Sequence, residues 1–173
     1  LGNRVKAIAD EAADAGHDVT AGSAYWRAFT YYRSAERVLS GKDPRKLPMY
    51  ERCIECFYTG IDLTPHPYER ITIPFDGHEL EGLFLPPRTA ARGTPAPVII
   101  FPTGADALPE EQLFRGAQEM TARGAGVLVF NGPGQGKSIR VHGIPTIPDY
   151  ERVFTAAVDY LMGRDDVDHD RIG

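Results

Sequence analysis

The sequence predicts an α/β protein in which a helical N-terminal segment precedes a parallel sheet. Three observations lead to this prediction. Apolar residues recur at helical spacing up to about residue 63, they alternate at strand spacing from about residue 70, and further on short apolar runs alternate with helical stretches. Such alternation is typical of right-handed βαβ units, whose parallel sheet is covered on both faces.

Three helices are expected in the N-terminal segment. The first ends at Gly16, because glycine is favoured just after the last turn of a helix. The second has Thr20 or Ser23 as its N-cap and is closed by Gly41. The third begins at Pro48 and carries apolar residues on two faces, which predicts that it is largely buried.

A Cys-x-x-Cys pair, Cys53 and Cys56, lies in the third predicted helix. A redox pair needs its first thiol at a helix N-terminus, whereas a helix that begins at Pro48 puts Cys53 beyond the first turn. A structural zinc site needs four ligands, and the sequence has no second cysteine pair. We therefore expect both cysteines to be packing residues.

Strand patterns dominate the rest of the chain. Asp76-Gly77 is predicted to be a hairpin turn, and "VIIF" and "GVLVF" are predicted to be buried strands. One helix is expected from Pro109 through Arg123, ended by Gly124, and another begins near residue 150. Only two or three parallel strands are expected, which is too few for a complete sheet and favours a truncated chain. The predicted domains are residues 1–64 and residues 65–173.

Composition excludes several classes of function. The 173 residues are 42% hydrophobic and 25% charged with a formal net charge of −5, as in an ordinary globular protein. Basic residues are scattered among acidic ones, which argues against a nucleic-acid partner. No apolar run approaches the length of a membrane span, and the start lacks the features of a signal peptide, so a cytoplasmic location is predicted.

The segment "NGPGQG", residues 131–136, is here named the glycine loop, and it raises the possibility of a nucleotide site. A phosphate loop follows the pattern G-x-x-x-x-G-K-S/T, which Gly136, Lys137 and Ser138 match. Asn131 stands where the first glycine is required, and Pro133 has no N–H to offer a phosphate. The following "SIRVHGIPTIP" is rich in β-branched residues and proline, so no helix is expected there. The alternative is a tight turn whose glycines supply positive φ.

Six stretches, in this order, resemble the N-terminal portion of the α/β-hydrolases that carry a helical N-terminal domain: "GHDVTAGSAYWRAFTYYRSAE", "TIPFDGHELEGLFLPP", "VIIFPTGADALPEE", "VLVFNGPGQGKS", "DYERVFTAAVDYL" and "DVDHDRIG". The resemblance covers essentially the whole chain and extends to 2,6-dihydropseudooxynicotine hydrolase, fungal polyketide-shortening hydrolases and fermentation-respiration-switch-type esterases. It implies an incomplete α/β-hydrolase sheet preceded by a lid-like helical domain.

The resemblance also implies a reaction. The nucleophile of the family lies in a G-x-S-x-G elbow, which is expected beyond residue 173, so the chain by itself is expected to be inactive. The whole protein is expected to hydrolyse an ester or the C–C bond of a 1,3-dicarbonyl, to need no metal or organic cofactor, and to form a homodimer.

Site residues follow from the same resemblance. It implies that Gly104 and Ala105, in the loop after the third strand, supply a backbone N–H to the oxyanion hole. Asp106 matches a position where one branch of the family has a functional carboxylate. This carboxylate either orients a substrate carbonyl or a water, or caps the helix that starts at Pro109.

Four aromatic residues of the helical domain are candidates for substrate binding: Tyr25, Trp26, Tyr31 and Tyr32. They are expected to line an apolar pocket for an aromatic or polyketide-like small molecule. The alternative is that aromatic residues at helical spacing belong to the core. Two other functions also stay open, a nucleotide-binding protein with a phosphate-loop-like site and a noncatalytic helical interaction domain on an α/β scaffold.

Overall fold

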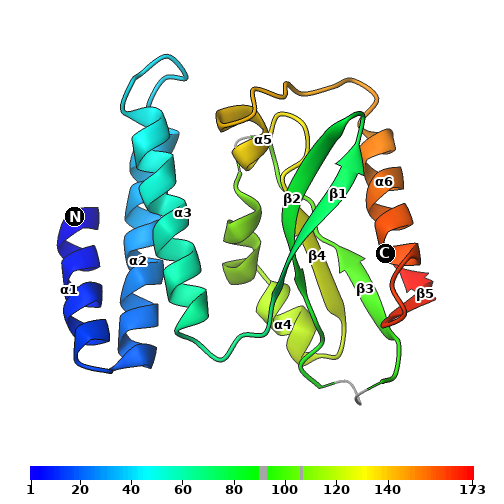
Figure 1. Cartoon of the computed structure of the whole chain (residues 1–173), viewed down its shortest axis with the longest axis horizontal. Coiled ribbons are helices and arrows are strands. Elements are labelled where there is room, and N and C mark those ends of the chain that lie inside the picture. Colours follow the sequence, from blue (N-terminus) through cyan, green and yellow to red (C-terminus); the bar gives the residue numbers. More distant parts are fainter. Residues whose placement is uncertain (90–92, 106) are drawn as a thin grey trace. The chain divides into compact units, whose positions relative to one another are not determined.

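The computed structural model describes residues 1–89, 93–105 and 107–173, and these form two compact units, Leu1–His66 and Pro67–Gly173. The first unit contains three helices, α1 (Gly2–Asp14), α2 (Asp18–Arg37) and α3 (Lys46–Asp62). Helix α2 packs against both α1 and α3 and runs antiparallel to each of them (Figure 1).

The core of the helical unit lies between α2 and α3. A Cβ atom added at Gly22 would lie 3.0 Å from the carbonyl oxygen of Gly60, so the two glycines allow a close approach of the helices. Cys53 and Cys56 are buried and are not disulfide-bonded, and burial raises the pKa of the Cys56 thiol to about 11. The prediction that both cysteines are packing residues is confirmed.

Both predicted ends of the second helix are wrong, and the third helix begins at Lys46, two residues before the predicted Pro48. Helix α2 begins at Asp18, not at Thr20 or Ser23, and it ends at Arg37, before Gly41. The Lys46 ammonium, at the start of α3, donates to the carbonyl oxygens of Glu36 and Leu39. The Lys46 side chain thus satisfies carbonyls at the end of α2 that a glycine C-cap motif would otherwise satisfy, so α2 needs no glycine to end.

The second unit is built on a five-stranded sheet in the order β1-β2-β4-β3-β5. Its strands are β1 (Glu69–Phe75), β2 (His78–Leu85), β3 (Ala96–Ile100), β4 (Gly126–Phe130) and β5 (Val167–Ile172). Strand β3 runs parallel to both β4 and β5, while β1 and β2 form an antiparallel hairpin whose β2 pairs with β4. Asp76 and Gly77 have φ of 46° and 77°, which confirms the predicted turn. The sheet is therefore mixed, and only its β3, β4 and β5 part is parallel.

Helices cover the two sides of the sheet (Figure 1). On one side α6 (Glu151–Met162) packs Val153, Ala157 and Leu161 into a core formed with strand residues. On the other lie the short 3₁₀ helix η1 (Pro109–Phe114) and α4 (Ala117–Ala122). The predicted single helix from Pro109 to Arg123 is wrong, because Gly116 has a φ of 140° that breaks it.

Among the residues that the structure describes, no helix combines the length and the apolar character that crossing a membrane requires.

A tight contact between β2 and β4 gives a first testable prediction. A Cβ atom at Gly82 would lie 2.3 Å from the carbonyl oxygen of Val129 and 2.7 Å from the Cα of Phe130, both backbone atoms. Gly82→Ala is expected to lower the free energy of unfolding by about 1–3 kcal/mol, because two paired strands must separate. Urea denaturation of the full-length protein measures this change.

Gly41→Ala is the matched control, because a Cβ atom at Gly41 meets nothing within 4 Å and its φ is not positive. Its free energy of unfolding is expected to change by no more than about 0.5 kcal/mol. Equal effects of the two substitutions would contradict the argument from strand spacing.

Candidate active site

Two loops leave the same edge of the sheet. Strands β3 and β4 are parallel neighbours, so the loops at their carboxyl ends are adjacent. These are residues 101–108, here named the β3 loop, and the glycine loop, residues 131–136. In open α/β sheets, ligands bind at the carboxyl ends of the strands, which makes this edge the candidate site.

Gly104 and Ala105 lie in the exposed part of the β3 loop. The carbonyl oxygen of Gly104 accepts a 3.0 Å hydrogen bond from the N–H of Ala107. Within the described ranges, neither the Gly104 N–H nor the Ala105 N–H donates to another residue. A Cβ atom at Gly104 would meet nothing within 4 Å, so this backbone faces open space. The two N–H groups are accessible to an external acceptor, as oxyanion donors must be.

Asp106 lies outside the described residues. Both roles considered for its carboxylate therefore stay predictions.

Two buried glutamines hold the β3 loop. The amide of Gln112, in η1, donates to the carbonyl oxygen of Pro102 at 2.6 Å. The amide of Gln135, in the glycine loop, donates to the carbonyl oxygen of Thr103 at 2.8 Å and accepts from the N–H of Gly132 at 3.2 Å. Neither glutamine was predicted from the sequence. The available signal for Gln135 was its place between two glycines, as a side chain that can both donate and accept a hydrogen bond.

A helix does begin in the glycine loop, contrary to the prediction. Helix α5 runs from Gly136 to Arg140. The side-chain oxygen of Asn131 accepts a 2.8 Å hydrogen bond from the N–H of Lys137, and the Ser138 hydroxyl donates to the carbonyl oxygen of Asn131 at 2.6 Å. These side-chain bonds satisfy groups at the helix start, which offsets the low helix propensity of the residues that follow.

Glycine supplies unusual backbone geometry in this loop. Gly134 and Gly136 have φ of 78° and 40°. Gly132 has no positive φ, but a Cβ atom there would clash with the hydroxyl of Tyr150. The loop is thus a tight turn whose glycines are required sterically.

The groups that a phosphate would need are already bound within the protein. The Lys137 ammonium lies 2.7 and 2.8 Å from the two carboxylate oxygens of Glu81, and His142 Nε2 lies 3.4 Å from one of them. Burial by itself would raise the pKa of Glu81, but the bonds from Lys137 and His142 lower it, so the carboxylate stays charged. The backbone N–H of Lys137 is bound to Asn131 and its ammonium is bound to Glu81, so neither group is available to a nucleotide phosphate. The nucleotide-binding alternative is therefore not favoured.

Tyr25 and Trp26 pack inside the helical unit. The Tyr25 hydroxyl donates a 2.6 Å hydrogen bond to Asp10. Burial, and to a smaller extent this hydrogen bond, raises the pKa of Tyr25 to about 12. The Trp26 ring packs edge-on against His66, with ring centroids 5.4 Å apart.

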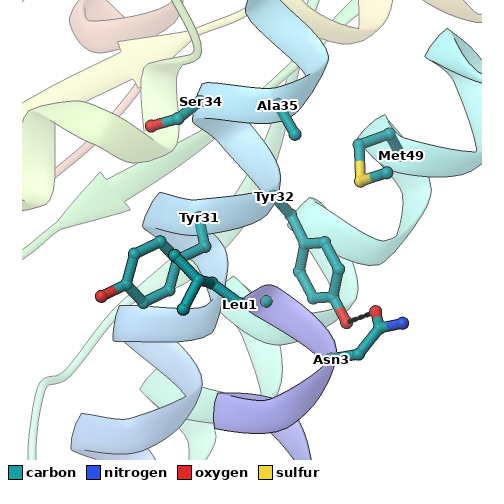
Figure 2. A pocket seen from close by; sticks show the side chains of 8 residues that line it. Leu1, Asn3, Tyr31, Tyr32, Ser34, Ala35 and Met49 are labelled. Atoms are coloured by element: carbon teal, nitrogen blue, oxygen red, sulfur yellow. Dashed lines mark hydrogen bonds between the residues drawn. The ribbon is translucent and has the colours of Figure 1, made fainter.

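Tyr31 and Tyr32 instead line an open cavity of about 500 Å³ in the helical unit. Figure 2 shows the two rings, with the Tyr32 hydroxyl bonded to the side-chain oxygen of Asn3 at 2.7 Å. The other lining residues are Leu1, Gly2, Asn3, Ser34, Ala35 and Met49. The structure thus brings two of the four candidate aromatic residues to one cavity.

No group of three or more His, Cys, Asp or Glu side chains among the described residues is placed to hold a metal ion.

Comparison with known sequences finds relatives over most of the chain, although no family model matches. The chain is 37% identical over 160 residues to the α/β-hydrolase xenA of Xenoacremonium sinensis, a match that covers 91% of this chain and 38% of xenA. It is 37% identical over 162 residues to the α/β-hydrolase gkaG of Penicillium citrinum, which covers 92% of this chain and 38% of gkaG. The chain thus spans less than half the length of these relatives.

Solved structures show the same fold. The crystal structure of 2,6-dihydroxy-pseudo-oxynicotine hydrolase superposes with a TM-score of 0.82 at 26% identity, covering 100% of this chain and 47% of that chain. An esterase of Pyrobaculum calidifontis superposes with a TM-score of 0.50 at 19% identity, covering 82% of this chain and 45% of the esterase. These similarities do not favour a noncatalytic interaction domain.

Proposed function

This chain is similar in sequence and in fold to the α/β-hydrolases over most of its length, and from that premise we propose that the whole protein is a serine hydrolase acting on a small molecule. The observation that carries the proposal is the β3 loop. Its Gly104 and Ala105 N–H groups are exposed at the sheet edge where the family places an oxyanion donor.

In the proposed reaction, residues outside these 173 supply the Ser of a G-x-S-x-G elbow, its acidic partner and the His. The Ser oxygen attacks the substrate carbonyl carbon, His takes the Ser proton, and the carbonyl π electrons move to oxygen. Gly104 or Ala105, together with the N–H that follows the nucleophile, binds the resulting oxyanion. Collapse forms an acyl-enzyme and expels the leaving group, which takes the proton from His. Water then hydrolyses the acyl-enzyme.

One acyl-enzyme mechanism covers both reaction types that we propose. An ester expels an alcohol, whereas a 1,3-dicarbonyl cleaved at its C–C bond expels an enolate. The cavity lined by Tyr31 and Tyr32 supports an aromatic or polyketide-like substrate, since aromatic rings bind apolar ligands and a phenolic hydroxyl can orient them. The lid role of the helical unit, the homodimer and the cytoplasmic location stay predictions that rest on the resemblance.

The test uses the full-length protein. We expect it to hydrolyse members of a panel of aryl esters and aromatic 1,3-diketones, and to be labelled by a fluorophosphonate at one Ser within a G-x-S-x-G. Replacement of that Ser by Ala is expected to abolish labelling and to lower kcat by at least about 10³-fold.

Ser23→Ala is the matched control, because Ser23 occupies an exposed position of α2. This variant must keep both labelling and turnover. If the wild-type protein shows no fluorophosphonate labelling and no turnover on either substrate class, the hydrolase proposal is wrong.

A further inference from the structure

We propose that Gln135 is a positioning residue for the oxyanion hole, which it orients by holding the Thr103–Gly104 peptide. This inference rests on the proposed serine hydrolase function. It concerns a side chain in the glycine loop that itself touches no substrate.

The Gln135 side chain joins the two loops of the site. It is 8% exposed, and it uses both ends of its amide, one for the Thr103 carbonyl oxygen and one for the Gly132 N–H. The carbonyl requires the NH₂ end and the N–H requires the oxygen end, so only one orientation of the amide satisfies both. The side chain is therefore held at both ends by backbone groups.

The Thr103 carbonyl and the Gly104 N–H belong to one peptide unit. This peptide is trans, so its planar geometry makes the two groups point in opposite directions. By bonding the Thr103 oxygen, Gln135 fixes the plane of the peptide and thereby the direction of the Gly104 N–H, away from the glycine loop. A hydrogen bond to the carbonyl also polarises the peptide, which strengthens its N–H as a donor.

The next peptide is held in a similar way. The N–H of Ala107 bonds the Gly104 oxygen, which orients the Ala105 N–H. In the described part of the β3 loop, the last backbone hydrogen bond to β4 is the one that the Phe101 N–H donates to the Leu128 carbonyl oxygen. Beyond it the β3 loop has left the sheet, so its orientation depends on Gln112, Gln135 and its own turn.

Gln112 provides the comparison. Its amide bonds the Pro102 oxygen, one peptide earlier, and so orients the Thr103 N–H, which is not an oxyanion donor in the proposed reaction. Gln112→Met and Gln135→Met each remove a buried amide and one bond to the β3 loop while keeping the length of the side chain. Only the second releases the Thr103–Gly104 peptide.

The experiment measures kcat and KM of the full-length protein on an aryl ester, together with the affinity of a trifluoromethyl ketone that mimics the tetrahedral state. Gln135→Met is expected to lower kcat by about 10- to 100-fold and to leave KM within about twofold, since oxyanion contacts form only in the transition state. The affinity of the ketone is expected to fall by the same factor. Gln112→Met is expected to keep kcat within about threefold.

Gln135→Glu provides a second readout, which also serves if Gln135→Met does not fold. An ionised Glu accepts from Gly132 but cannot donate to Thr103, whereas a protonated Glu can do both. The ratio of its kcat to that of the wild-type protein is therefore expected to rise as the pH falls. Far-UV circular dichroism at each pH separates this effect from a loss of folded protein.

The outcomes separate the two proposals. If the wild-type protein turns over no substrate, the proposed function fails and this inference falls with it. If the wild-type protein is active but Gln135→Met keeps its kcat and its ketone affinity, the hydrolase stands and the role of Gln135 is wrong. A flat pH ratio for Gln135→Glu would also overturn the inference.

Discussion

Glu36→Ala is expected to lower the free energy of unfolding by about 3–5 kcal/mol, the range typical of removing one partner of a buried ion pair. The Glu36 side chain is fully buried in α2, and one of its carboxylate oxygens accepts a 2.6 Å hydrogen bond from Arg33, whose side chain is 5% exposed. Its other oxygen lies 2.9 Å from the Lys46 ammonium. The substitution leaves the buried Arg33 guanidinium without this carboxylate. It also removes the ion pair between Glu36 in α2 and Lys46 in α3.

Urea denaturation of the full-length protein, followed by helix content, measures the loss. Glu55→Ala is the matched control, because Glu55 is 59% exposed and pairs with Lys6 at 3.7 Å. Removing an exposed pair of this kind is expected to cost no more than about 0.5 kcal/mol. A loss below about 1 kcal/mol for Glu36→Ala would contradict the importance of burial.

Gly136→Ala is expected to lower the free energy of unfolding by about 3–4 kcal/mol, the sum of two costs. A non-glycine residue at the φ of 40° costs about 1–2 kcal/mol. The new Cβ atom would also clash with the side-chain oxygen of Asn131, which must move and release its bonds to Lys137 and Glu81. Each lost bond costs about 1 kcal/mol.

Gly143→Ala separates the two costs. Gly143 has a φ of 66°, but a Cβ atom there would meet nothing within 4 Å. Only the backbone strain of about 1–2 kcal/mol is therefore expected. Thermal melts and urea curves of both variants in the full-length protein make the comparison, and an equal loss would show that the clash with Asn131 adds nothing.

Features of short range could be predicted from the sequence. The Asp76-Gly77 turn was predictable because two successive positive φ values select such residue pairs. The burial of Cys53 followed from the apolar faces of its helix. The break at Gly116 was not predictable in the same way, since a glycine inside a helical pattern is often tolerated and its φ of 140° depends on the packing around it.

The site was predictable only in part. The resemblance led to Gly104 and Ala105, and the structure places both in an exposed loop at the carboxyl end of a parallel strand. The bond between Gln135 and Thr103 joins residues 32 positions apart, and no spacing rule covers such a pair. The helix that begins at Gly136 depends likewise on Asn131, whose side-chain oxygen accepts a hydrogen bond from the N–H of Lys137. Helix propensities do not include such a side-chain bond.

The sequence by itself determined that three helices precede the strands, and it determined the hairpin and the packing role of the cysteines, because these depend on periodicity and on the conformations open to neighbouring residues. Only the tertiary structure decided that β4 lies between β2 and β3. This order brings Glu81 to Lys137, 56 residues away, and the glycine loop to the β3 loop. Such bonds depend on which strands become neighbours, and that is settled by burial of the whole sheet, not by any local pattern.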